Sequence, residues 1–294
     1  MTMVFASENS LVSVIRRHAV LAYFVLAYLI AWGGILLVAL PVGGLAAAPE
    51  ALAPLAGPVF IAMALGPSLA SIILTALLDG RAGLRALFGG VVRWRIGVRY
   101  YAAALFVVPA VALLVLLVFS GFSSVYTPAF LAGGGATLLL TGLVFGLVAG
   151  AFEELGWTGF AAARLLSGHT VVATALLIGV LHGVWHLLAG YYWGDGASYG
   201  LLFIPYFIMA WIVALVALRL LIVWLYRRTG STLIAMLAHA GNTGGLLMLW
   251  PTGTSPSEQT LWTAVFAVML LGVVAALVRV RGTGDRPLTP RSSS

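Results

Sequence analysis

The sequence predicts an all-α membrane protein with about eight transmembrane helices, and three observations lead to that prediction. The 294 residues are 62% hydrophobic and only 8% charged, whereas soluble domains carry about 25% charged residues. Apolar runs long enough to cross a bilayer recur along the chain. The basic residues gather in alternate connections between those runs. We therefore expect an integral membrane protein in contact with the lipid bilayer.

Each predicted span is an apolar run of about 20 residues. The runs cover residues 19–40, 55–78, 99–120, 135–160, 171–190, 200–225, 231–250 and 260–280. The fifteen basic residues are all arginine, and none lies in the connections near Glu50, Phe122, Asp195 and Glu258. Arg219 is grouped here with Arg227 and Arg228, at the end of one run. The positive-inside bias then places both termini in the cytoplasm, and we expect a bacterial plasma membrane.

The chain divides into four segments. Residues 1–134 hold the first three helices, with an amphipathic cytoplasmic segment at 79–98. Residues 135–250 form a core that contains the polar residues described next, residues 251–281 form the last helix, and residues 282–294 form a disordered tail. The first apolar run is predicted to be a membrane helix because no cleavage site follows it. The net charge of +7 is assigned to membrane topology, so no nucleic-acid partner is expected.

A few ionisable residues fall inside the apolar runs of the core. Glu153 and Glu154 are adjacent in AFEELGWTGF (151–160), and three histidines occupy two later runs. Placing an ionisable group at bilayer depth costs about 2.5 to 3.5 kcal/mol on insertion scales, so such residues are functional candidates by default. Helical rise from the flanking arginines puts most of them at similar depth. The predicted cluster consists of Glu153, Glu154, His182, His186 and His239, with Asn242 as an amide neighbour.

Hydrolytic chemistry suits this set of side chains. His182 and His186 are four residues apart and share one helix face. Because Gly183 follows His182, there is no HExxH motif, and a carboxylate must come from another helix. A buried glutamate is a plausible general base for water. The histidines at 182, 186 and 239 could bind zinc, or they could position the water without a metal.

Two simpler interpretations compete with catalysis. A lone histidine in a membrane helix is more often a hydrogen-bond partner for a neighbouring helix, and a glutamate at a helix end is usually solvated. The conjunction of five ionisable residues on three helices favours catalysis or ion handling over packing. A transporter could use the same carboxylates as a proton relay, but broken helices and inverted repeats are not evident.

Three segments together resemble the CPBP intramembrane proteases, which include the type 2 CAAX prenyl proteases and Abi-like proteins. They are EELGWTGF at 153–160, LHGVWHLL at 181–188 and WLYRRTGSTLIAMLAHAGNT at 224–243. The resemblance covers about residues 135–250. It implies an endopeptidase that acts on a membrane-associated protein or peptide. By the same resemblance Glu153 activates water, Glu154 shapes the site, His186 and His239 are the motif histidines, and Asn242 stabilises the oxyanion.

The chain departs from the family pattern at three positions. The pattern has arginine four residues after the second glutamate, where this chain has Thr158. His182 stands at the position of an aromatic residue, and Asn242 follows His239 by three residues rather than four. The lost guanidinium predicts a less preorganised glutamate pair, or dependence on Arg164. The alternative function is therefore a catalytically inactive membrane scaffold or immunity-type protein with the same fold.

Overall fold

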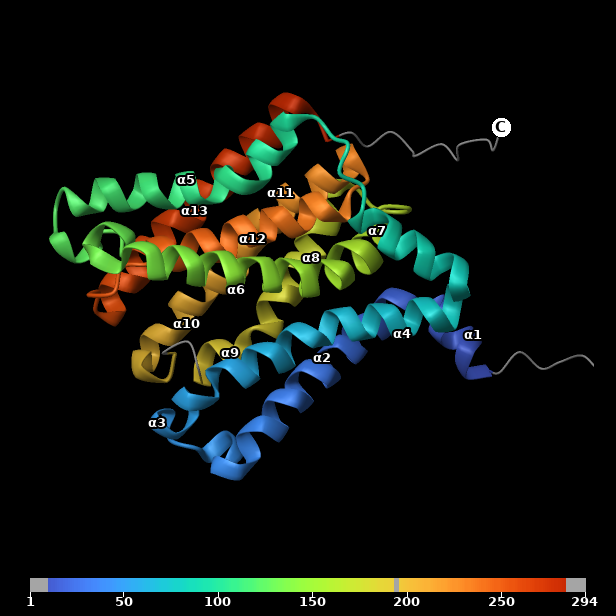
Figure 1. The fold of residues 1–294 in the computed structure, drawn as a ribbon, viewed down its shortest axis with the longest axis horizontal. Helices are drawn as coiled ribbons and strands as arrows, with labels where there is room; N and C mark the ends of the chain where they lie inside the picture. Colours follow the sequence, from blue (N-terminus) through green and yellow to red (C-terminus); the bar gives the residue numbers. More distant parts are fainter. Residues whose placement is uncertain (1–9, 193–195, 284–294) are drawn as a thin grey trace, which may run out of the picture.

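The computed structural model describes residues 10–192 and 196–283, and all regular structure in these ranges is helical (Figure 1). The predicted all-α class is confirmed. Most of the predicted tail, from residue 284 onward, lies outside the described residues. The helices are α1 (Ser10–Arg17), α2 (Ala19–Ala39), α3 (Pro49–Leu52), α4 (Ala56–Val91), α5 (Val98–Ser120), α6 (Gly135–Gly156), α7 (Ala163–Leu165), α8 (Val171–Trp185), α9 (Leu187–Tyr192), α10 (Phe203–Phe207), α11 (Ala214–Thr229), α12 (Thr232–Leu249) and α13 (Pro256–Arg281).

Seven helical stretches of the described chain are long and apolar enough to cross a membrane. The remaining predicted span, residues 171–190, is shorter than expected, because α8 has only 15 residues. It ends at His186, whose N–H bonds to the carbonyl of Gly183, three residues back, rather than continuing the i−4 ladder. The predicted run 171–190 is therefore two helices, α8 and α9, and His186 lies at the break between them.

The predicted amphipathic segment is attached to the second span. Within α4, Gly80 has φ 60° and ψ −152°, a conformation that residues with a side chain avoid. The chain turns there, as Figure 1 shows, and the rest of α4 runs to Val91 in a new direction. The prediction of a helix over 79–98 is right as far as Val91, whereas residues 92–97 are not helical.

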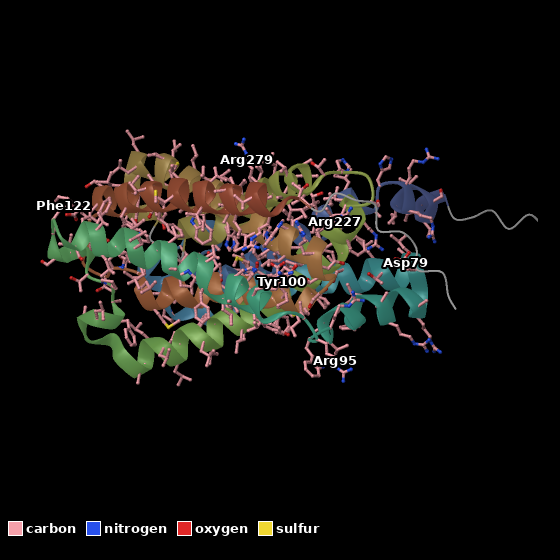
Figure 2. All side chains as sticks on the ribbon, turned by 90° about the horizontal axis from the view of Figure 1, so that it is seen from above. Asp79, Arg95, Tyr100, Phe122, Arg227 and Arg279 are labelled. Carbon is pink, nitrogen blue, oxygen red and sulfur yellow. The ribbon has the colours of Figure 1, made fainter. Side chains whose placement is uncertain are left out.

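Several arginines lie in one half of the bundle. Figure 2 shows Asp79, Arg95 and Arg227 in the half away from Phe122, and Arg279 nearer the middle. This agrees with the expectation that arginines occupy alternate connections. Which end faces the cytoplasm stays a prediction.

A glycine stripe positions α6 against α12. Gly142, Gly146 and Gly150 recur every fourth residue, and each closely approaches the backbone of α12. A Cβ at Gly150 would lie 2.2 Å from the carbonyl oxygen of Met236. Small residues allow membrane helices to pack this closely. Glu154 follows Gly150 by one further four-residue step, so the stripe directs its side chain toward α12.

A second close approach joins α8 to α11 and to the π-helical segment Ile208–Val213 that precedes it. A Cβ at Gly183 would lie 2.1 Å from the carbonyl oxygen of Trp211, and one at Gly179 would lie 2.7 Å from the Cα of Val216. His182 stands beside these glycines on α8. The packing therefore places α11 directly against the helix that carries the first two histidines of the predicted cluster.

Candidate active site

The two glutamates stand on the last turn of α6, inside the bundle. Glu153 is 2% exposed and Glu154 is fully buried. The chain then continues through a π-helical segment, Trp157–Ala162, into α7. The helical path thus runs on to Leu165, beyond the predicted end of this run at residue 160, and it does so with a wider turn. Such π-helical insertions occur frequently at functional sites.

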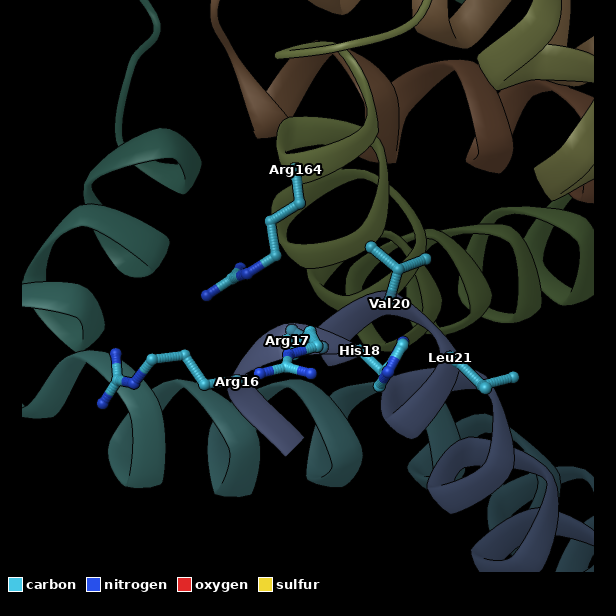
Figure 3. A pocket seen from close by; sticks show the side chains of 7 residues that line it. Arg16, Arg17, His18, Val20, Leu21 and Arg164 are labelled. Carbon is cyan, nitrogen blue, oxygen red and sulfur yellow. The ribbon is translucent and has the colours of Figure 1, made fainter. Parts of the chain in front are cut away.

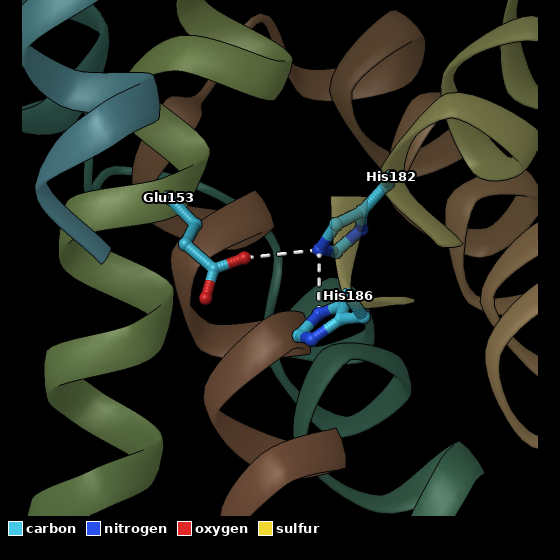
Figure 4. Close-up of side chains that lie close together, drawn as sticks. All are labelled: Glu153, His182 and His186. Atoms are coloured by element: carbon cyan, nitrogen blue, oxygen red, sulfur yellow. Dashed lines mark hydrogen bonds and ion pairs between the residues drawn. The ribbon is translucent and has the colours of Figure 1, made fainter. Parts of the chain in front are cut away.

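One oxygen of Glu153 is held and the other is available. Oε2 lies 3.0 Å from Nε2 of His182, accepts a hydrogen bond of 3.3 Å from Nε1 of Trp157, and lies 3.8 Å from Nε2 of His239. Among the described residues, no hydrogen bond reaches Oε1. Figure 4 shows this second oxygen turned away from His182. Glu153 is therefore fixed in place while one oxygen stays free to bind another group.

Glu154 has its oxygens fully occupied. Arg219 donates to both, from one NH group to Oε2 at 2.8 Å and from the other to Oε1. The hydroxyl of Thr158 donates to Oε2 at 2.5 Å, and Nδ1 of His239 lies 2.7 Å from Oε1. A guanidinium nitrogen of Arg219 lies farther from Nδ1, at 3.5 Å. Because the nearer partner is a carboxylate, which only accepts hydrogen bonds, Nδ1 of His239 carries its hydrogen here. The other ring nitrogen, Nε2, then faces Glu153.

Arg219 is the buried ionisable residue of this cluster that the sequence did not single out. It lies within α11, and its side chain is buried rather than placed in a connection with Arg227 and Arg228. Besides Glu154, it contacts His182, because its Nε donates to Nδ1 of that ring at 3.2 Å. An arginine inside an apolar run is a functional candidate by default. That signal was present in ALVALRLLIVWLYRR (214–228), but grouping arginines by loop concealed it.

The two histidines of α8 also meet, as their spacing predicts. Nε2 of His186 lies 3.2 Å from Nε2 of His182. The ring of His186 is stacked on Trp211, with ring centroids 4.2 Å apart, and Trp185 contacts it edge-on. These indole rings fix the orientation of His186 at the break between α8 and α9.

The ligand atoms of Glu153, His182 and His186 lie within 4.8 Å of one another, which is compact enough for a metal ion. The surrounding donors do not fit one. A histidine that binds zinc usually donates its other ring N–H to an acceptor, whereas Nδ1 of His182 accepts from a guanidinium. The ring hydrogen is then on Nε2, the nitrogen that would have to bind the ion. His239, the third predicted ligand, donates from Nδ1 to Glu154, which is the usual arrangement for a zinc-binding histidine, so the misfit lies at His182.

Asn242 is half-buried on α12, about one turn beyond His239. Within the described part of the chain, no hydrogen bond or ion pair joins it to the glutamates or histidines. Its expected role at the oxyanion therefore stays a prediction.

Arg164 does not replace the missing arginine of the family pattern. It forms an ion pair with Asp79 of α4, and its guanidinium lies 3.6 Å from the ring centroid of Phe160. It faces a cavity of about 410 Å³ beside α1, which Figure 3 shows. The other residues that line this cavity are Arg16, Arg17, His18, Ala19, Val20 and Leu21.

Residues 134–245 match the family model described as type II CAAX prenyl endopeptidase Rce1-like. The match supports a resemblance of this core to the CPBP family of CAAX-type proteases. The resemblance predicted from the three motifs is confirmed. The matched range extends from the start of α6 into α12, and it contains both glutamates, the three clustered histidines and Arg219. A search of curated proteins gave no match.

Proposed function

We propose that this protein is an intramembrane endopeptidase that hydrolyses a peptide bond in a membrane-associated protein or peptide, with water activated by Glu153. The observation that supports this most strongly is the placement of the Glu153 carboxylate. Its Oε2 is held by His182 and Trp157 inside a buried cluster and faces Nε2 of His239. At the level of the family, an endopeptidase of the CAAX type is expected.

A water molecule bound by both Glu153 and His239 is the proposed nucleophile. Their facing atoms, Oε2 and Nε2, are 3.8 Å apart. A water about 2.8 Å from each would complete a triangle at normal hydrogen-bond distances. Glu153 takes a proton from this water while the water oxygen attacks the carbonyl carbon of the substrate. The tetrahedral intermediate collapses when that proton passes to the leaving amine, which yields a carboxylic acid and an amine.

Glu154 and His239 have complementary roles in this scheme. The carboxylate of Glu154 accepts from Nδ1 of His239 and so fixes the ring orientation, as the aspartate does in a serine protease triad. His239 then holds the water on its other nitrogen. Asn242, on the same helix, would donate to the oxyanion once substrate is bound. His186 would position the substrate or the water beside His182.

A catalytically inactive scaffold or immunity-type protein is the alternative. Thr158 favours that alternative, because it removes a guanidinium from the glutamate pair. Arg219 weakens this argument for inactivity, because its guanidinium donates to the carboxylate of Glu154 from another helix. The lost charge is thus supplied within the bundle, and we expect activity.

The test is cleavage of a quenched fluorescent peptide library by the full-length protein in detergent. Glu153→Gln and His239→Ala are compared with Glu50→Gln, a matched change of an exposed glutamate. We expect the first two variants to lose at least about a hundredfold in rate, the lower range for loss of a general acid or base, and the control to keep the wild-type rate. Equal rates in all four proteins, with the fold intact, would support the scaffold instead.

A further inference from the structure

We propose that Arg219 is the positioning residue of the site, which pairs with Glu154 and holds His182 as the tautomer whose ring hydrogen is on Nε2. This deepens the proposed function and depends on it for its consequence in catalysis. The contacts that support it come from three helices. Arg219 of α11 reaches Glu154 of α6 and His182 of α8.

Burial separates Arg219 from the arginines at the ends of the helices. Its side chain is 1% exposed, and that of Glu154 is fully buried. A guanidinium in such a place needs a hydrogen-bonded partner for its charge, and Glu154 provides one in the two-pronged geometry that arginine favours. A salt bridge that only held the helices together would need no contact beyond the one between Arg219 and Glu154. The additional bond from Nε to His182 is the feature that points to a role in the chemistry.

The tautomer follows from which atoms can donate. Arginine has only donors, so Nδ1 of His182 must offer its lone pair to Nε of Arg219. A neutral imidazole carries a single ring hydrogen, and that hydrogen is therefore on Nε2. This nitrogen lies 3.0 Å from Oε2 of Glu153 and 3.2 Å from Nε2 of His186. Arg219 thus directs the one N–H of His182 toward the proposed general base.

The opposite tautomer would conflict with both neighbours. A hydrogen on Nδ1 would face the N–H of Arg219, and the lone pair on Nε2 would face the carboxylate oxygen of Glu153. Arg219 therefore excludes that tautomer through direct contact. Its absence would release His182 to rotate or to exchange tautomers, and Glu153 would lose one of the two donors that hold Oε2.

Arg219 also accounts for the threonine in the first motif. Thr158 and Arg219 both donate to Oε2 of Glu154, the first from one turn along the same helix and the second from α11. At position 158 a hydroxyl donates to this carboxylate, while the guanidinium comes from α11. The packing of α11 against α8, rather than the local helix alone, sets the geometry of the glutamate pair.

Nitrogen-15 NMR of the histidine rings tests the tautomer directly. The full-length protein would be labelled with ¹⁵N-histidine in detergent micelles, and the signal of His182 assigned by its loss in His182→Gln. We expect unprotonated Nδ1 and protonated Nε2 in the wild type. The variant Arg219→Met/Glu154→Gln, which removes both charges and so buries no unpaired ion, should lose this pattern. The control Arg228→Met, on the same helix but bonded to the carbonyl oxygens of Arg281 and Gly282, should keep it.

A wild-type His182 with its hydrogen on Nδ1, or on both nitrogens, would overturn the proposal. So would a wild-type pattern that persists unchanged in Arg219→Met/Glu154→Gln. The NMR result does not require turnover, so a protein that fails to cleave peptides but shows the expected tautomer would count against the proposed function and not against Arg219.

Discussion

Two arginine–carboxylate pairs in this protein have the same chemistry and different surroundings. Arg219 and Glu154 are 1% and 0% exposed, whereas Arg164 and Asp79 are 28% and 41% exposed. The buried pair also contacts two histidines, and the exposed pair lies beside an open cavity. The same type of ion pair can thus organise neighbouring side chains when it is buried, or lie at the surface without doing so. Buried charge must be matched precisely, while exposed charge is screened by water.

The largest expected difference concerns stability. Arg219→Ala leaves Glu154 buried and unpaired, which should cost about 3 to 5 kcal/mol of unfolding free energy. Arg164→Ala removes an exposed ion pair, which should cost less than about 1 kcal/mol. Denaturant titration of both variants in the same detergent would measure the difference. Similar losses in the two variants would mean that burial does not distinguish the pairs.

A smaller effect is expected from the glycine stripe that places Glu154 against α12. A Cβ at Gly150 would lie 2.2 Å from the carbonyl oxygen of Met236. A Cβ at Gly89 would have open space around it, with no atom of another helix within 4 Å. Gly150→Ala should cost about 1 to 3 kcal/mol through overpacking. Gly89→Ala, in the outer part of α4, should be neutral or slightly stabilising, because alanine favours helix.

Thermal unfolding monitored by tryptophan fluorescence would compare the two glycine variants. If Gly150→Ala unfolded at the same temperature as Gly89→Ala, then close packing of α6 on α12 would not be what holds the glutamates in place. A lower unfolding temperature for Gly150→Ala alone would support the argument.

The smallest expected effect is that of metal removal. Because the donors around His182 oppose a cation, chelation of zinc should leave peptide cleavage unchanged within about twofold, well below the loss of at least about a hundredfold expected on removing the base. The measurement is the initial rate before and after dialysis against a chelator, followed by addition of zinc. Loss of activity that zinc restores would contradict our interpretation of the Arg219–His182 contact.

Much of the fold could be predicted from the sequence because the bilayer imposes strong rules. Apolar length predicted the spans, and the rarity of ionisable residues within them singled out Glu153, Glu154, His182 and His239. All four meet in one cluster. The cost of burying a charge leaves few places where such residues are tolerated, so their presence is informative.

The parts that could not be predicted depend on tertiary packing. Nothing local in 171–190 showed that the helix would break at His186, and the π-helical segment after Glu154 replaces what looked like ordinary helix. Arg219 was assigned to a connection because topology rules count arginines by loop. Its partners lie 65 and 37 residues away in sequence, so only the assembled helices reveal its place.

The most direct test of the account compares Arg219→Lys with Arg164→Lys in the peptide cleavage assay. Both changes keep the positive charge and remove the forked guanidinium, so they isolate hydrogen-bond geometry. We expect Arg219→Lys to lower kcat by about tenfold to a hundredfold, as loss of an orienting partner does elsewhere, with little change in KM, and Arg164→Lys to retain the wild-type rate. Equal rates in the two variants would contradict the claim that the buried arginine organises the hydrolytic site.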